Sequence, residues 1–398
     1  MSNLPNIGKK TIRDIDLSGQ RALVRVDFNV PLDNGRITDN SRIRAALPTI
    51  RALLEGGASV ILCSHLGRPK GHDPALSLQP IASELESLLG SPVQFASDCV
   101  GPEVKSAAQA LSPGQVLLLE NLRFHEEEEK NDPGFAQQLA SLGTLYVNDA
   151  FGAAHRAHAS TEGVTHYLPG VAGLLLEKEV LYLGALVANP PKPFAAVIGG
   201  AKVSSKIGAL EHLLQAIDTL VIGGGMANTF LAARGYNVQA SKIEDDQVDV
   251  ARRVLSDAEQ RGVGVVLPDD VVAADEFAAT ANHETCTVDA IPSGYMALDI
   301  GPRTLDAFVE SLRDARAIVW NGPMGVFEME PFASGSYGLA RALADSEATV
   351  VVGGGETAQL VSEAGVADRF DHVSTGGGAS LEMLEGRTLP GVAALQDA

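Results

Sequence analysis

Short apolar runs recur along the chain, separated by stretches with helical periodicity. In the first half the helical patterns cover Ser41–Glu55 and Leu78–Leu89. The apolar runs occupy Arg21–Val26, Ser59–Cys63, Gln115–Leu119, Thr144–Val147, Phe194–Ile198, Thr219–Ile222, Ala317–Trp320, Thr349–Val352 and His372–Thr375. Apolar runs without alternation are typical of strands buried on both faces. Strands that alternate with helices predict parallel sheets with right-handed crossovers, so we expect an α/β fold.

One helical pattern lies between the two halves, in Val171–Pro193. Its apolar stripe consists of Leu176, Val180, Leu183 and Val187. This spacing predicts an amphipathic helix, with Glu177–Glu179 on the solvent side and the prolines from Pro190 onward ending it. We expect the helix to join two α/β domains, one for a small anion and one for a nucleotide. The stretch by itself is equally compatible with a crossover helix inside one large domain.

The length of 398 residues favours two domains over a single core. We therefore expect two doubly wound, Rossmann-like parallel-sheet domains joined by a hinge helix. The predicted boundaries are residues 1–170 for the first domain, 171–189 for the helix and 190–387 for the second domain.

Composition and charge narrow the range of partners. The net charge of −20 argues against a general binder of nucleic acid or membranes. The three cysteines lie far apart without a CxxC motif, which favours a reducing compartment and no zinc site. No apolar run is long enough to span a membrane, and the N-terminus lacks the apolar core of a signal peptide. We expect a cytoplasmic monomer that acts on small molecules.

Polar side chains follow the apolar runs of the first half. The basic ones are His65, Arg68, Arg123 and Arg156, and Arg42 opens the Ser41–Glu55 helix. Because parallel strands end at one edge of a sheet, these groups can converge on a carboxylate or phosphate. The alternative for any single arginine is an ordinary surface ion pair. Asp27 and Asn29 fit a substrate hydroxyl or a strand-end turn equally well.

Triple glycines follow the apolar runs of the second half, at 223–225, 353–355 and 376–378, each before a helical pattern. Glycine exposes backbone N–H groups, and a helix N-terminus adds a positive dipole end, so these turns favour a bound nucleotide. The alternative is that they only allow close packing. Lys202 and Lys206 are predicted to share a helix face and to flank an anion. The sequence lacks GxxxxGK[ST] and has no GxGxxG after its first strand.

Eight segments, taken together and in order, resemble the phosphoglycerate kinase family. They are RVDFNVP (25–31), SHLGRP (64–69), ENLRFH (120–125), AHRAHAS (154–160), GGAKVSSKI (199–207), GGGMANTF (223–230), WNGPMGVFE (320–328) and STGGGASLEMLEG (374–386). The resemblance implies phosphoryl transfer between 1,3-bisphosphoglycerate and ADP, giving 3-phosphoglycerate and ATP. It also implies Mg²⁺ as cofactor, a hinge, and a C-terminal segment, 388–398, that completes the first domain.

The resemblance also assigns site residues. Those that match the family's 3-phosphoglycerate site are Asp27, Asn29, Arg42, His65, Leu66, Gly67, Arg68, Arg123 and Arg156. Those that match its nucleotide contacts are Lys206, Gly223, Gly224, Asn321, Glu328, Gly353, Gly354, Gly355, Glu356 and Thr357. Arg42, Lys202, Gly376 and Gly377 match groups that stabilise the transferred phosphoryl group.

One position departs from the family pattern, because Glu356 stands where aspartate is expected as the carboxylate beside the metal. The extra methylene raises the question of whether the ion is held directly or through water. Two other classes of function stay open from the residues alone. A nucleotide-dependent oxidoreductase would need a GxGxxG turn, which is lacking here, and a non-catalytic binding module would not need Arg42, Lys202 and Glu328.

Overall fold

The computed structural model describes residues 7–398, and the chain divides into two compact units. Unit 1 comprises the described residues up to Leu181 together with Thr388–Ala398, and unit 2 comprises Tyr182–Arg387. Each unit has its own six-stranded sheet, in which all strands are parallel. The predicted α/β class with two parallel sheets is confirmed. Within the described residues, no helix is both long and apolar enough to cross a membrane.

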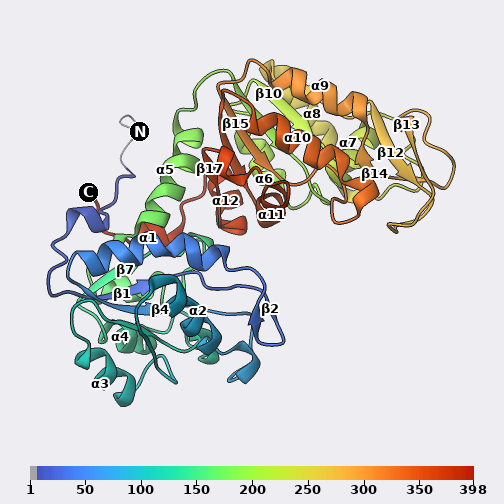
Figure 1. Cartoon of the computed structure of the whole chain (residues 1–398). Coiled ribbons are helices and arrows are strands. Elements are labelled where there is room, and N and C mark those ends of the chain that lie inside the picture. The colour runs from blue at the N-terminus through green and yellow to red at the C-terminus, as the bar shows by residue number, and fades with distance from the viewer. Residues whose placement is uncertain (1–6) are drawn as a thin grey trace. The chain divides into compact units, whose positions relative to one another are not determined.

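The sheet of unit 1 has the strand order β5-β6-β4-β1-β7-β8 (Figure 1). Its strands are β1 (Arg21–Arg25), β4 (Ser59–Cys63), β5 (Val93–Phe95), β6 (Val116–Leu118), β7 (Leu145–Asn148) and β8 (Gly170–Ala172). A short hairpin consists of β2 (Leu32–Asp33) and β3 (Arg36–Ile37). The helices are α1 (Ser41–Glu55), α2 (Gln79–Leu89), α3 (Pro102–Ala110), α4 (Pro133–Ala140) and the C-terminal α13 (Pro390–Ala393).

Helix α1 places a predicted site residue beside the sheet. Its apolar residues Ile43, Leu47 and Ile50 pack into the same core cluster as Val24 of β1, and all are buried. The i, i+4, i+7 spacing of these residues creates the buried stripe. Figure 1 shows α1 on one side of this sheet and α3 and α4 on the other. Because the stripe fixes the rotation of α1, it also fixes Arg42 in the first turn.

The sheet of unit 2 has the order β11-β10-β9-β15-β16-β17. Its strands are β9 (Phe194–Ile198), β10 (Thr219–Ile222), β11 (Gly264–Val266), β15 (Ala317–Asn321), β16 (Thr349–Gly353) and β17 (His372–Val373). The helices are α6 (Ile207–Leu213), α7 (Gly224–Ala233), α8 (Val248–Arg261), α9 (Pro302–Leu312), α10 (Ser334–Ala344), α11 (Gly355–Glu363) and α12 (Gly377–Leu384). Helices α7, α11 and α12 begin directly after strand ends, as the glycine turns predict.

A second sheet of unit 2 was not predicted. It is antiparallel, with the order β13-β12-β14, and its strands are β12 (Asp270–Ala274), β13 (His283–Thr287) and β14 (Met296–Ile300). Strand β13 reads HETCT and its first three residues are exposed, so it carries no apolar run. An edge strand that is open to solvent gives little hydrophobic signal, which accounts for the omission of β13, whereas the mostly buried apolar residues of β12 were missed as a strand.

The helix between the two halves is α5 (Leu174–Ala188), and the division between the units falls inside it, after Leu181. The start of the predicted stretch belongs instead to β8, which pairs with β7. Leu176 and Leu183 of the predicted stripe are fully buried. The prediction that Glu179 faces solvent is wrong, because its side chain is fully buried. With Leu186 buried as well, the buried residues Leu176, Glu179, Leu183 and Leu186 follow the i, i+3, i+7, i+10 spacing of one helix face, and this face includes Glu179.

The last residues of the chain pack on unit 1. The backbone N–H of Gly391 donates to Ala154 O at 2.8 Å, and the Asn148 side chain donates to Gly391 O at 2.9 Å. Further along, Gln396 N donates to Gly170 O at 2.9 Å, next to the buried side chain of Leu395. These bonds fix the chain terminus against the ends of β7 and β8.

We expect Leu395→Ala to destabilise unit 1, because it removes a buried side chain and leaves a cavity, at a cost of about 2–5 kcal/mol. Urea unfolding would measure the loss, and hydrogen exchange would localise it to β7 and β8. Asp397→Ala is the control, since that side chain is exposed and pairs only with Lys9 at the surface. An unchanged unfolding midpoint for Leu395→Ala would show that the C-terminal segment does not support unit 1.

Candidate active site

The predicted basic residues gather at the carboxyl edge of the sheet in unit 1. Strand register aligns this edge, because Arg25 at the end of β1 pairs with Cys63 of β4 and Asn148 of β7. The loops that follow these strands and β6 carry Asp27, Asn29, His65, Leu66, Gly67, Arg68, Arg123 and Arg156. Parallel strands present their C-terminal loops on one side, which is where ligands bind in open α/β sheets.

Arg42 is held by the carboxylate of Asp27. Its Nη1 donates to Asp27 Oδ2 at 2.8 Å, and Asp27 is buried whereas one third of the Arg42 side chain is exposed. Asp27 Oδ1 accepts from the backbone N–H of Asn29 at 3.2 Å, and Asn29 Oδ1 accepts from Gly67 N at 2.9 Å. Asp27 and Asn29 therefore connect α1 with the loops after β1 and β4.

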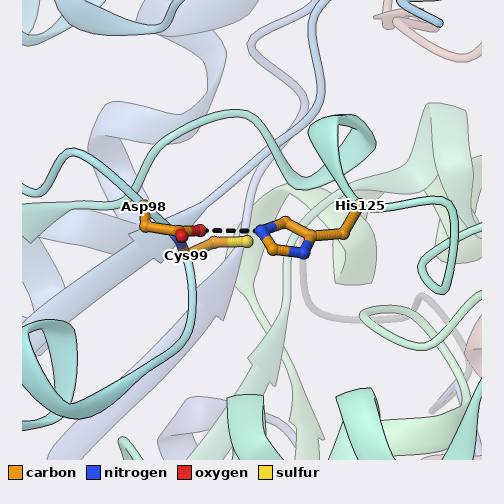
Figure 2. A group of neighbouring side chains, drawn as sticks. All are labelled: Asp98, Cys99 and His125. Carbon is orange, nitrogen blue, oxygen red and sulfur yellow. Dashed lines mark hydrogen bonds and ion pairs between the residues drawn. The ribbon is translucent and has the colours of Figure 1, made fainter. Parts of the chain in front are cut away.

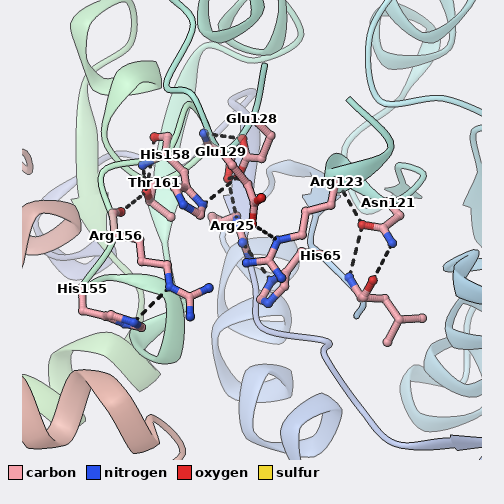
Figure 3. Close-up of polar contacts among 12 residues, drawn as sticks. Arg25, His65, Asn121, Arg123, Glu128, Glu129, His155, Arg156, His158 and Thr161 are labelled. Carbon is pink, nitrogen blue, oxygen red and sulfur yellow. Dashed lines mark hydrogen bonds and ion pairs between the residues drawn. The ribbon is translucent and has the colours of Figure 1, made fainter. Parts of the chain in front are cut away.

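Arg123 lies in the short 3-10 helix η3 (Leu122–Phe124) and is almost fully buried. Its Nη1 donates to Gly67 O at 2.7 Å, and its Nε forms an ion pair with Glu129 at 3.0 Å (Figure 3). Burial lowers the pKa of Arg123, and the nearby carboxylate of Glu129 offsets part of this decrease. Arg156 is half-buried, and its Nε donates to His155 Nε2 at 3.1 Å. Arg68, in contrast, is exposed.

The pKa of His65 is affected by several of these arginines at once. Its pKa lies well below the usual range, first because the ring is buried and then because four guanidinium groups act on it. In decreasing order of effect they belong to Arg25, Arg123, Arg156 and Arg42. Burial and nearby arginines also lower the pKa of His158 to about 4. The site is thus a concentration of fixed positive charge, in which His65 and His158 are neutral.

Two residues of this site escaped the sequence-based prediction. Arg25 is fully buried at the end of β1, and Asn121 is fully buried after β6. Asn121 donates to Leu66 O at 2.8 Å and accepts from Leu66 N at 3.2 Å, so the backbone of the predicted site residue Leu66 is engaged by this side chain. A signal for Arg25 existed, because a charge inside an otherwise apolar run must find a buried partner.

The second group of predicted residues lies at the carboxyl edge of the sheet in unit 2. Lys206 precedes α6, and its Nζ donates to Asn321 Oδ1 at the end of β15. Burial lowers the pKa of Lys206, and the carboxylate of Glu356 opposes this shift. Lys202 is exposed and lies outside any helix. The prediction that Lys202 and Lys206 share a helix face is therefore wrong, because α6 begins only at Ile207.

The glycines of this edge serve different purposes. A Cβ on Gly223 would lie 2.4 Å from Met324 Sδ, and one on Gly224 would lie 2.6 Å from Pro323 O, so close packing accounts for both. A Cβ on Gly355 would meet nothing within 4 Å, although Gly355 opens α11. A Cβ on Gly377 would lie 3.4 Å from Gly355 N, so the N-termini of α11 and α12 lie side by side. Two adjacent helix N-termini favour an anion.

Other predicted nucleotide contacts are partly occupied within the protein. Thr357 is fully buried, and its Oγ1 accepts from Gly322 N at 2.7 Å. The backbone N–H of Gly376 donates to Ser374 Oγ at 3.2 Å. Asn321 Nδ2 is buried without a hydrogen-bond partner and lies 3.1 Å from the position of a Cβ on Gly353. An unpartnered buried donor at this edge is costly unless a ligand satisfies it.

A cavity of about 750 Å³ opens beside these helix ends. Its polar wall includes Glu328 and Glu356, and Gly224 and Gly225 contribute backbone. The unpredicted antiparallel sheet contributes Met296 and Leu298 to its apolar wall, and the exposed ring of Phe277 also lines it. The volume and the mixture of apolar wall and few polar groups are typical of small-molecule sites.

Within residues 7–398, one group of three side chains could hold a metal ion, namely Asp98, Cys99 and His125 (Figure 2). His125 Nε2 and Asp98 Oδ1 lie 2.7 Å apart, and burial raises the pKa of the Cys99 thiol well above its usual range. A neutral thiol and an imidazole are poor ligands for Mg²⁺, which prefers oxygen. The contact between Asp98 and His125 instead links the loop after β5 to the loop after β6.

Comparisons with known proteins agree with this geometry. The family model described as Phosphoglycerate kinase matches residues 12–387. A phosphoglycerate kinase of Moorella thermoacetica is 61% identical over 392 residues, covering 98% of this chain and 100% of that protein. One of Chloroflexus aggregans is 57% identical over 399 residues, with 98% and 100% covered.

Solved structures show the same similarity. The phosphoglycerate kinase of Coxiella burnetii superimposes with a TM-score of 0.87 at 40% identity, over 97% of this chain and 98% of that one. That of Pyrococcus horikoshii OT3 also gives a TM-score of 0.87, at 33% identity and with 97% and 98% covered.

We expect the stability of the protein to fall as the pH decreases from about 6.5, the usual histidine pKa, to about 4, because of His158. In this window the unfolded chain binds a proton at His158 that the folded chain does not, so acid favours unfolding. Denaturation at a series of pH values should show this slope in the wild type and a slope smaller by up to one proton in His158→Gln. Equal slopes would contradict the lowered pKa.

Proposed function

Since the chain belongs to the phosphoglycerate kinase family, we propose a division of the family's reaction between its two units. The reaction transfers a phosphoryl group reversibly from 1,3-bisphosphoglycerate to ADP and gives 3-phosphoglycerate and ATP, a step of glycolysis. The chain is thus a phosphotransferase with a carboxyl group as acceptor. Unit 1 binds the three-carbon acid, unit 2 binds the nucleotide, and α5 acts as the hinge.

The observation that carries this division is the concentration of arginine charge at the sheet edge of unit 1. 3-Phosphoglycerate carries a carboxylate at one end and a phosphate at the other. Guanidinium groups bind both by paired hydrogen bonds. Arg123, Arg156 and the exposed Arg68 bind these anionic ends, and His65 and Asn29 add neutral polar contacts. Asp27 orients Arg42 towards the same region, as its 2.8 Å bond supports.

Unit 2 offers peptide N–H groups where unit 1 offers arginines. The adjacent N-termini of α11 and α12 support binding of nucleotide phosphates at Gly353–Thr357 and Gly376–Gly378. Lys206 and the unpartnered Asn321 Nδ2 lie at the same edge. The neighbouring cavity has room for the base and ribose, with Glu328 in reach of the sugar hydroxyls.

We propose Mg²⁺ as the cofactor, with Glu356 as its protein ligand. Mg²⁺ is commonly held by one or two carboxylates together with substrate phosphates, and Glu356 is an exposed carboxylate in the first turn of α11. When bound, the ion neutralises charge on the phosphates.

The chain's own residues then position the two substrates and stabilise the charge on the transferred phosphoryl group. Phosphoryl transfer needs in-line alignment and stabilisation of charge on the transferred oxygens, more than it needs covalent help. Arg42 approaches these oxygens from unit 1, and Lys202 and the amides of Gly376 and Gly377 approach them from unit 2. No acid–base residue is required, since the carboxylate that leaves 1,3-bisphosphoglycerate is already a weak base. Closure of the two units about α5 would exclude water, which competes for the acyl phosphate.

We also propose that the enzyme works as a cytoplasmic monomer. Three dispersed free cysteines, two of them buried, support a reducing compartment. The direct test of the activity is consumption of ATP that depends on 3-phosphoglycerate, followed in a coupled assay. ATP turnover without dependence on 3-phosphoglycerate would contradict the proposal.

We expect Arg42→Ala to lower kcat by about 10²–10³-fold while KM for 3-phosphoglycerate changes little, because a group that acts in the transition state affects kcat. Steady-state kinetics with both substrates would measure this. Arg44→Ala is a matched control on the same helix, since Arg44 is exposed and its Nε donates to Asn40. A raised KM with unchanged kcat would make Arg42 a simple substrate ligand.

We expect Glu356→Ala to raise the Mg²⁺ concentration that gives half-maximal activity, because it removes the proposed ligand. Glu356→Asp should keep or raise activity, because the carboxylates of aspartate and glutamate can both bind Mg²⁺. Glu363→Ala, at the other end of α11, is the control. If the Mg²⁺ titration of Glu356→Ala coincides with that of the wild type, Glu356 is not a metal ligand.

A further inference from the structure

A fully buried polar network underlies the arginine site of unit 1. At its centre, the guanidinium of Arg25 donates through Nε to Ser160 Oγ at 2.8 Å and lies with Nη2 3.1 Å from His65 Nδ1. The Nη1 atom of the same guanidinium donates a hydrogen bond to Val26 O. Ser160 in turn donates to Glu128 through Oγ, at 2.5 Å, and through its backbone N–H, at 2.9 Å. Figure 3 shows Arg25 between Glu128 and His65.

The direction of the bond between Arg25 and His65 follows from chemistry. A guanidinium has five N–H donors, no acceptor, and does not lose its charge in proteins. Nδ1 of His65 must therefore accept, with its lone pair towards Arg25. The ring proton then resides on Nε2, since a neutral imidazole carries one N–H. Burial and the surrounding arginines, which lower the pKa of His65, independently keep the ring neutral.

We propose that Arg25, supported by Glu128, is a positioning residue that fixes His65 as the Nε2–H tautomer, so that His65 presents a hydrogen-bond donor to the anionic substrate. The proposal rests on the proposed role of His65 in binding the three-carbon acid. With the opposite tautomer, a lone pair would face a carboxylate or phosphate and repel it. A charged ring would donate, but would add to the repulsion among the arginines.

Glu128 supports this arrangement by balancing a buried charge. Arg25 and Glu128 are both fully buried, and Ser160 bridges them. Burial raises the pKa of Glu128, and Arg25 is the largest opposing influence. An Arg25 without this partner would be an uncompensated buried cation, which is strongly unfavourable. Because Glu128 compensates its charge, the guanidinium of Arg25, which can only donate hydrogen bonds, can be buried next to His65 Nδ1.

The test has a readout that does not depend on activity. In the full-length protein labelled with ¹⁵N-histidine, the two ring nitrogens of His65 are assigned by their loss in His65→Gln. A lone-pair shift at Nδ1 and an N–H shift at Nε2 are expected near neutral pH. The reverse pattern, or an equal mixture of the two tautomers, in the wild type would overturn the proposal whatever the variants do.

Variants then test the link to binding. Arg25→Met should release the tautomer preference and raise KM for 3-phosphoglycerate about ten- to a hundredfold, the worth of a hydrogen bond to a charged group, while KM for ATP stays unchanged. Arg25→Met combined with Glu128→Gln removes both buried charges, and serves if the single variant does not fold. Arg21→Met is the control, since Arg21 lies at the opposite end of β1 and contacts Leu142 O.

The outcomes separate the two claims. A fixed Nε2–H tautomer that persists in a folded Arg25→Met protein would show that Arg25 is only structural. An unchanged KM for 3-phosphoglycerate in His65→Gln would instead refute the role of His65 in the proposed function, whichever tautomer the wild type shows.

Discussion

Mutual repulsion among arginines at one sheet edge is the constraint on which unit 1 depends. Guanidinium groups do not deprotonate, so the protein can relieve the repulsion only by carboxylates or by a bound anion. Asp27 on Arg42, Glu129 on Arg123 and Glu128 behind Arg25 provide part of this balance. Burial first, and then the nearby arginines, lower the pKa values of His65 and His158. In the proposed function, a three-carbon acid with two anionic groups completes the balance.

Unit 2 uses the same architecture for a different purpose. Its parallel strands also end at one edge, but peptide N–H groups and helix N-termini lie there beside Lys206 and Glu356, where unit 1 has a group of arginines. Backbone dipoles can hold several phosphates without the repulsion that a cluster of arginines would bring. Two units with similar sheets can therefore bind the two halves of one reaction, because the residues after the strands differ while the strands do not.

Much of this organisation could be predicted from the sequence. The boundaries of α1, β4, β9 and β10 match the predicted ranges, because apolar period and strand length agree there. The strand-end residues of unit 1 could be predicted to converge, since topology alone brings them to one edge. The family segments suggested the individual roles of these residues, which stay predictions.

Other features depend on tertiary contacts that no local pattern reveals. Glu179 lies on the buried face of α5 with Leu176 and Leu183, although a charged side chain favours solvent, and Lys202 lies outside the helix that its spacing with Lys206 suggests. The glycines at 223 and 224 are required by the close approach of Met324 and Pro323, which only the fold brings near. The charge of Arg25 inside an apolar run indicated a buried partner, but the sequence could not identify Ser160 and Glu128, which are distant along the chain.

The most direct test of the account is to map each ligand by hydrogen exchange of the full-length protein. 3-Phosphoglycerate alone should protect backbone amides in 64–68 and 121–125 of unit 1. MgADP alone should protect amides in 199–206, 353–357 and 376–380 of unit 2. If both ligands instead protect the same edge of one unit, or if 3-phosphoglycerate leaves the loops of unit 1 unprotected, the division between the units is wrong.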